Sequence, residues 1–169
     1  CFYTNIARIS KGHKNYKNIY SLCVDRVQVS SPGFGDFLKE RVPEIDKVTS
    51  PILNNGWYDI ENTNRKIHYV DKDFFYFFPA KFSKGGIDFL DTPNSIAVSK
   101  EFADYLAKSG PVIGREIDHN SNRYIVNAVF DEYGNNVLSG CDILMNNEVI
   151  RKSGHNDSIH SYRGSMTFF

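Results

Sequence analysis

The sequence predicts an α+β fold rich in β-sheet, and three observations support this prediction. Aromatic residues make up 14% of the 169 residues and include 13 Phe and 10 Tyr, and aromatic side chains suit the half-buried surface of a pleated sheet. Apolar and polar residues alternate over 18–29 and 123–130, which is typical of strands. Helical spacing of apolar residues marks 34–42 and 100–108 as short amphipathic helices.

The composition indicates one globular domain or two closely packed lobes. The 20 basic and 20 acidic residues give a formal net charge of zero, which argues against a nucleic-acid partner bound by bulk charge. No run of about 18 apolar residues occurs, so we predict no membrane span within this chain. Because the chain begins at Cys1 without Met or a signal-peptide pattern, we expect it to be a piece of a longer protein.

The N-terminal part of the chain predicts the order strand, helix, strand, strand. The strand over 18–29 precedes the helix over 34–42, which ends at Pro43 because the residue before proline avoids the helical region. Residues 57–60 and 65–70 then form a predicted hairpin, joined by the residues between them.

The rest of the chain predicts a compact mixed segment followed by strands. Asp71 or Asp73 caps a short helix over the aromatic run Phe74–Phe78, and Ser99 caps the helix over 100–108. The predicted strands of this part cover residues 95–98, 112–117, 123–130, 141–145 and 163–169.

The aromatic run has two interpretations. As part of a core, it carries Phe74, Phe75 and Phe78 into the interior of the protein. As an exposed platform, it would bind carbohydrate or peptide. We favour the core and keep Tyr76 and Phe77 as candidate contacts at a lobe interface or with a partner.

Known catalytic motifs do not occur in the sequence. It contains no G-x-S-x-G, no H-E-x-x-H and no G-x-x-x-x-G-K-[ST]. Asp71-x-Asp73 resembles the start of a calcium loop, but Phe74 and Phe75 follow and cannot supply oxygen ligands. We therefore predict no catalytic residue, no cofactor and no metal.

Two further groups of polar residues are candidate sites. His155, Asp157 and His160 could hold a transition metal or join Ser158 in a catalytic triad, but a solvated loop explains them more simply. Asp131 and Glu132 follow a strand end and are interpreted as the start of a turn.

The three cysteines form no C-x-x-C pair, which excludes zinc-ribbon and thioredoxin motifs. Cys23 and Cys141 lie in apolar segments and are interpreted as small core residues. A disulfide between them is the alternative, and Cys1 could be the lipidated N-terminus of an exported protein.

A series of short motifs carries a more specific signal because the motifs follow one another in a fixed order. The clearest is the run Tyr69-Val70-Asp71-Lys72-Asp73-Phe74-Phe75-Tyr76-Phe77-Phe78-Pro79, and the others are 16–22, Gly85-Gly86 with Phe89, 91–99, 111–117 and 124–131. Together they resemble the MacB-like periplasmic core domain, the extracytoplasmic part of FtsX-like ABC transporter permeases. The sequence departs from this pattern at Asn127-Ala128 and lacks the basic residue after Gly85-Gly86.

The resemblance implies a two-lobed α+β fold. Residues 1–68 and 136–169 would form a porter-like β-α-β lobe near the membrane, and 69–135 would form an inserted distal lobe of mixed α/β structure. The strand-like segments 19–29 and 163–169 are then expected in the same lobe, because both chain ends would continue into membrane helices.

The resemblance also implies a non-catalytic function on the periplasmic side of a bacterial inner membrane. The domain would couple ATP-driven motion of membrane helices to the handling of a substrate or partner. Its implied partners are a cytoplasmic ATP-binding subunit or domain, a periplasmic adaptor or substrate protein, and a second permease copy in a homodimer. The alternative function is an extracytoplasmic module that binds or senses a peptide or lipid.

Overall fold

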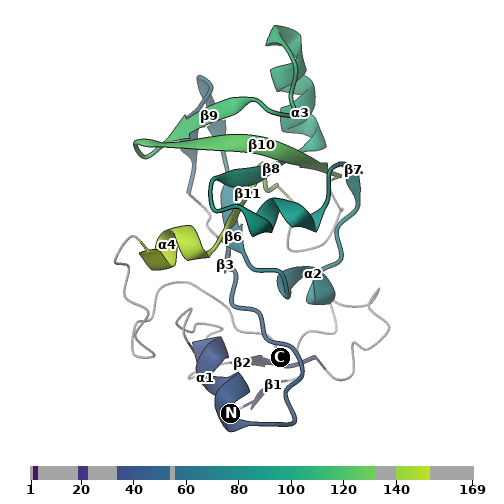
Figure 1. The fold of residues 1–169 in the computed structure, drawn as a ribbon, viewed down its shortest axis with the longest axis vertical. Helices are drawn as coiled ribbons and strands as arrows, with labels where there is room; N and C mark the ends of the chain where they lie inside the picture. Colours follow the sequence, from purple (N-terminus) through teal and green to yellow (C-terminus); the bar gives the residue numbers. More distant parts are fainter. Residues whose placement is uncertain (1, 4–18, 23–33, 54–55, 132–139, 153–169) are drawn as a thin grey trace. The chain divides into compact units, whose positions relative to one another are not determined.

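The computed structural model describes residues 2–3, 19–22, 34–53, 56–131 and 140–152 (Figure 1). It confirms the predicted α+β class, with short helices and a mixed sheet. The chain divides into two compact units. The terminal unit comprises the described parts of 1–53, 70–79 and 147–169, and the central unit comprises those of 54–69 and 80–146.

The boundaries of these units differ from those of the predicted lobes. Residues 54–69 belong to the central unit, because most of strand β6 (Ile67–Val70) lies beside β11 (Ile143–Asn146) in its sheet. Residues 70–79 belong to the terminal unit, where Asp71 is hydrogen-bonded to residues 49 and 50. The predicted strand 163–169 and most of 18–29 lie outside the described residues.

The terminal unit contains short elements. Its helix α1 confirms the predicted helix at 34–42 and ends at Arg41, two residues before Pro43. Leu38 is the buried apolar residue of this helix. The other apolar residues at helical spacing in 34–42 are half-buried, namely Phe34, Phe37 and Val42. The elements of the unit are β1 (Phe2–Tyr3), antiparallel to β2 (Ser21–Leu22), α1 (Phe34–Arg41), β3 (Ile52–Leu53), α2 (Phe74–Phe77) and α4 (Glu148–Lys152).

The central unit is built on a mixed sheet in the order β6-β11-β8-β10-β7, with β9 also paired to β10. Strands β8 and β10 are parallel, whereas the β8–β11, β10–β7 and β10–β9 pairs are antiparallel. Its other elements are β4 (Tyr58–Ile60), β5 (Thr63–Arg65), β7 (Phe82–Lys84), β8 (Ser95–Ser99), α3 (Lys100–Leu106), β9 (Glu116–His119), β10 (Asn122–Phe130), and 3-10 helices over Ile87–Asp91 and Ala107–Ser109.

The predicted hairpin is shorter than expected. Strand β4 pairs with β5, and not with the later β6, through a two-residue turn at Glu61 and Asn62. Both turn residues have positive φ, 53° and 59°, which is the backbone geometry that matches the twist of a two-residue hairpin. The β9–β10 hairpin turns in the same way at Asn120 and Ser121.

The core of the central unit follows the sequence pattern closely. Every residue of β8 is buried, and the predicted inward face of β10, namely Tyr124, Val126, Ala128 and Phe130, is buried as well. The Ser99 hydroxyl accepts a hydrogen bond from the Phe102 backbone N–H at 3.1 Å, so the predicted cap is confirmed. Cys141 is fully buried as a thiol, which confirms its interpretation as a core residue; Cys1 and Cys23 lie outside the described residues.

Gly85 fills a position that only glycine can occupy without strain. Its φ is +64°, and an added Cβ would lie 2.3 Å from the backbone oxygen of Asn127. Because backbone atoms cannot move aside as a flexible side chain can, this close approach of β7 to β10 requires a residue without a Cβ.

Candidate functional site

The best-defined polar cluster of the terminal unit surrounds the Asp71 carboxylate. Its Oδ1 accepts a hydrogen bond from the Phe74 backbone N–H at 2.8 Å. Its Oδ2 accepts from the Thr49 hydroxyl at 2.9 Å, the Ser50 N–H at 3.2 Å and the Asn147 side-chain amide at 3.4 Å. The carboxylate therefore joins three segments that are far apart in the sequence.

Asp71 is half-buried in this cluster. Burial raises the pKa of its carboxyl group, and the hydrogen bonds from Thr49, Ser50 and Phe74 oppose that rise because they stabilise the charged form. With four donors around two oxygens, the ionised carboxylate has well-satisfied hydrogen-bonding capacity. It is arranged as an acceptor that holds backbone and side-chain donors in place.

Asp73, two residues later, has a different environment. Its Oδ1 lies 3.1 Å from Lys47 Nζ and its Oδ2 lies 3.8 Å from Lys39 Nζ. The side chains of both lysines are more than one-third exposed, so these ion pairs contribute little to stability. Bonding to the Asp73 carboxylate raises the pKa of Lys47.

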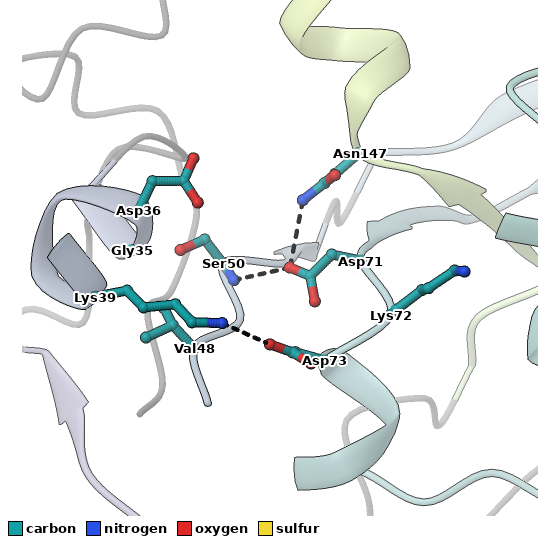
Figure 2. Close-up of a pocket in the computed structure, with 9 residues that line it drawn as sticks. All are labelled: Gly35, Asp36, Lys39, Val48, Ser50, Asp71, Lys72, Asp73 and Asn147. Carbon is teal, nitrogen blue, oxygen red and sulfur yellow. Dashed lines mark hydrogen bonds and ion pairs between the residues drawn. The ribbon is translucent and has the colours of Figure 1, made fainter. Parts of the chain in front are cut away.

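A cavity of about 290 Å³ lies beside these two aspartates (Figure 2). Asp36 and Lys39 line it from α1, and Figure 2 shows the Asn147 side chain and the Ser50 backbone nitrogen directed at the Asp71 carboxylate. The full lining is Gly35, Asp36, Lys39, Val48, Ser50, Asp71, Lys72, Asp73 and Asn147.

Gly35 allows α1 to approach this cavity closely. An added Cβ would lie 2.6 Å from Val48 Cγ1 and 2.7 Å from Ser50 Oγ, so a larger residue at this position requires either the helix or these two side chains to shift.

The cluster has the features of a structural junction and not those of a catalytic centre. A general base needs a proton donor of the substrate within hydrogen-bond reach, but the Asp71 oxygens already accept four bonds from the protein. Among the described residues, no group of three or more His, Cys, Asp or Glu side chains is placed to hold a metal ion.

The buried residues of the aromatic run are Phe74, Phe77 and Phe78, whereas the sequence predicts Phe74, Phe75 and Phe78. Phe74 and Phe78 are buried as expected, with ring centroids 4.9 Å apart. Phe75 is only half-buried, and Phe77 is buried at 3% exposure. Helical spacing explains the correction, because positions i, i+3 and i+4 share a face. Tyr76 is exposed at 41%, so it alone of the two candidate contacts presents an open surface.

The other candidate site residues fall largely outside the described residues. These are His155, Asp157, Ser158, His160 and Glu132. Asp131 is described: its carboxylate lies 4.0 Å from Lys81 Nζ, and its backbone N–H donates to the Lys81 carbonyl. The turn predicted to start at Asp131 lies outside the described residues.

The central unit contains a buried titratable residue that the sequence pattern does not identify. His68 on β6 is 5% exposed, and its Nδ1 has no hydrogen-bond partner within the part of the chain that the structure describes. Burial, with a smaller contribution from the Lys66 charge, lowers the pKa of His68 to about 4, against the opposing effect of Asp142. The imidazole is therefore neutral in the folded protein at neutral pH.

We expect this histidine to make the protein acid-sensitive. The unfolded chain takes up a proton near pH 6.5 and the folded chain only near pH 4, so stability falls as pH falls through this window, by about 3 kcal/mol at pH 4. A His68→Phe variant should lack this loss. Denaturant unfolding of both proteins at pH 7 and pH 4 measures the difference, and an equal pH dependence in the two would contradict the prediction.

The fold of this chain is similar to those of solved permease domains. A domain of a putative permease from Porphyromonas gingivalis has a TM-score of 0.67 at 15% identity over 84% of this chain, and this chain spans 62% of that one. The periplasmic region of MacB from Actinobacillus actinomycetemcomitans has a TM-score of 0.64 at 13% identity, covering 97% of this chain and 77% of the other. The chain has the MacB periplasmic fold.

A third structure with this fold is the extracellular domain of the noncanonic ABC-type transporter YknZ from Gram-positive bacteria. It has a TM-score of 0.60 at 12% identity, covering 89% of this chain and 81% of the other. Neither the protein-family profiles nor the curated protein sequences yield a match to this chain. The resemblance read from the motifs is thus confirmed in the fold.

The clearest motif of the MacB-like fold lies in the cluster described above. In Val70-Asp71-Lys72-Asp73-Phe74-Phe75, Asp71 bonds three segments and Phe74 is completely buried. The sequence pattern indicates only a helix-capping role for Asp71 and Asp73. Asp71 does bond the first N–H of α2, but its bonds to Thr49, Ser50 and Asn147 lie outside what a local pattern can indicate.

Proposed function

We propose that this chain is an extracytoplasmic domain of an ABC transporter permease. The observation that carries the proposal is the MacB periplasmic fold, which extends over 97% of the chain in one comparison. The ordered motifs from residue 16 to residue 131 support it independently of the coordinates. Among the described residues, no helix is long and apolar enough to cross a membrane.

The role we propose is mechanical and not catalytic. Movement of membrane helices, driven by ATP hydrolysis in a cytoplasmic subunit or domain, would pass through this domain to a substrate or partner outside the membrane. Such a role requires both ends of the domain to move as one body. The grouping of the described parts of 1–53 and 147–169 in one compact unit supports that requirement.

The proposed location is the periplasmic or extracytoplasmic side of a bacterial inner membrane. The proposed partners are the ATP-binding subunit or domain, a second copy of the permease, and a periplasmic adaptor or substrate protein. We propose Tyr76, an exposed aromatic residue, as a partner contact.

The full-length protein that contains this chain provides the test. It would be reconstituted in proteoliposomes with a fluorophore on a cysteine introduced at the exposed position Glu40 of α1. We expect the signal to change with ATP and to remain unchanged with a variant of the ATPase that cannot hydrolyse it. Saturable peptide or lipid binding, with no ATP-dependent change, would favour the binding module instead.

A second measurement tests the absence of catalysis. We expect the purified chain to hold no stoichiometric metal by elemental analysis and to show no hydrolase activity on ester, peptide or phosphate substrates. A tightly held metal ion that is lost in a His155→Ala, His160→Ala double variant would contradict the proposal.

A further inference from the structure

The chain passes between its two compact units four times. The passages follow Leu53, Tyr69, Pro79 and Asn146. Each unit is therefore joined to the other by four separate backbone connections.

The Asp71 carboxylate gathers the terminal-unit ends of these connections. Ser50 and Thr49 lie in the segment that leaves at Leu53, and both donate to Asp71. Asp71 itself follows the passage at Tyr69, and Asn147 is the first residue after the passage at Asn146. The fourth passage follows α2, whose first residue, Phe74, donates its N–H to the same carboxylate.

A backbone bond reinforces the same junction. The Asn147 N–H donates to the Val70 carbonyl at 2.9 Å, so the segments that begin at Val70 and Asn147 are joined directly next to Asp71. In Figure 2, the side-chain amide of Asn147 and the backbone nitrogen of Ser50 are both directed at the Asp71 carboxylate.

We propose that Asp71 is a clasp that fixes the four connections to one another where they leave the terminal unit. Hydrogen bonds to an ionised acceptor are about twice as strong as those between neutral groups, so one carboxylate can hold several donors in a fixed arrangement. The clasp exists independently of the proposed function. Its use in transport, where it would make the terminal unit pull all four connections together, rests on that function.

Asparagine cannot replace this carboxylate even though it has the same shape. Asp71 accepts on both oxygens, from Phe74 on one and from Thr49, Ser50 and Asn147 on the other. The side-chain amide introduced by Asp71→Asn offers one acceptor and one NH₂ donor, so one group of donors would face another donor. Asp73→Asn is the matched control, because Asp73 is two residues away and pairs with lysines that are more than one-third exposed.

Hydrogen exchange of the 169-residue chain tests the clasp. In Asp71→Asn we expect the exchange of the Ser50, Phe74 and Asn147 amides to accelerate together, by at least about tenfold, with less than about twofold change in β8 and β10. Asp73→Asn should leave all these rates within about twofold of the unchanged chain. Acceleration at Phe74 alone, or to an equal degree throughout the chain, would overturn the proposal.

A distance measurement provides the second readout. Spin labels would be placed at two exposed positions of the terminal unit, Glu40 on α1 and Glu148 on α4, with Cys1 and Cys23 replaced by serine. We expect Asp71→Asn to broaden the distribution of label distances and Asp73→Asn to leave it unchanged; an unchanged width in Asp71→Asn would count against the clasp. If Asp71→Asn does not fold, Thr49→Val removes one donor and should give the same pattern at smaller size; unchanged exchange in Thr49→Val would overturn the proposal.

Neither measurement involves a membrane or ATP. Failure of the clasp therefore leaves the proposed transport role untouched, and failure of the ATP-dependent movement leaves the clasp.

Discussion

Replacement of Phe74 by alanine is expected to lower the free energy of unfolding by about 3–5 kcal/mol. The Phe74 side chain is 0% exposed, and its ring lies 4.9 Å from that of Phe78 and 5.4 Å from that of Phe75, measured between centroids. Its removal would leave a cavity that a four-residue helix cannot close by a small shift, because the Phe74 N–H is held by Asp71.

The neighbouring residues provide the controls for this prediction. Phe75 is half-buried and Tyr76 is 41% exposed, so Phe75→Ala should cost clearly less than Phe74→Ala, and Tyr76→Ala should cost about 1 kcal/mol or less. Denaturant unfolding of the three variants gives the order. A loss for Phe75→Ala equal to that for Phe74→Ala would show that the run packs on the face predicted from the sequence.

Replacement of Arg65 by methionine is expected to cost about 3 kcal/mol. The Arg65 guanidinium lies 3.0 Å from the Asp142 carboxylate, and the two side chains are only 12% and 13% exposed. The same guanidinium lies 4.4 Å from the ring centroid of Phe102 and 5.2 Å from that of Tyr105. Loss of Arg65 leaves the nearly buried Asp142 carboxylate without its positive partner, with the Lys66 N–H as a remaining donor at 2.8 Å, and removal of one partner from such a pair is the costly outcome.

Arg123 is the matched control for Arg65. It also contacts carboxylates at 3.1 Å, those of Glu116 and Asp118, but its side chain is 63% exposed, so Arg123→Met should lower the free energy of unfolding far less than Arg65→Met does. Combining Arg65→Met with Asp142→Asn should cost less than the sum of the single variants, because the two groups interact. Equal losses of unfolding free energy in Arg65→Met and Arg123→Met would contradict the prediction that burial makes the Arg65 ion pair the more important of the two.

The elements that could be predicted from the sequence are those whose signals are local. Strand β10 has an uninterrupted alternating pattern, and Ser99 immediately precedes a helix with apolar residues at the right spacing. In both cases the residues that specify the element lie inside it. The sequence predicts a hairpin connection over 61–64, but the two-residue length of the turn at Glu61 and Asn62 could not be predicted, since glutamate rarely adopts positive φ.

The Asp71 cluster could not be found in this way. Its donors lie 22 residues away at Thr49 and 76 residues away at Asn147, and one of them is the backbone N–H of Ser50, which no residue type identifies. The burial of Phe77 was within reach, because Phe74, Phe77 and Phe78 follow the i, i+3, i+4 spacing of one helical face. The burial of His68 could not be predicted, because a histidine in a strand can lie on the buried face or on the exposed face.

The four passages between the units also constrain how this protein is made. The terminal unit draws on residues before Leu53 and after Asn147, so during synthesis its early segment is already outside the ribosome while its last segment has not been translated. The central unit, which ends at Asn146, can be completed first. Contacts between residues far apart in sequence form late, because the chain loses entropy when the long loop closes before the contacts can stabilise it. The terminal unit should therefore fold after the central unit.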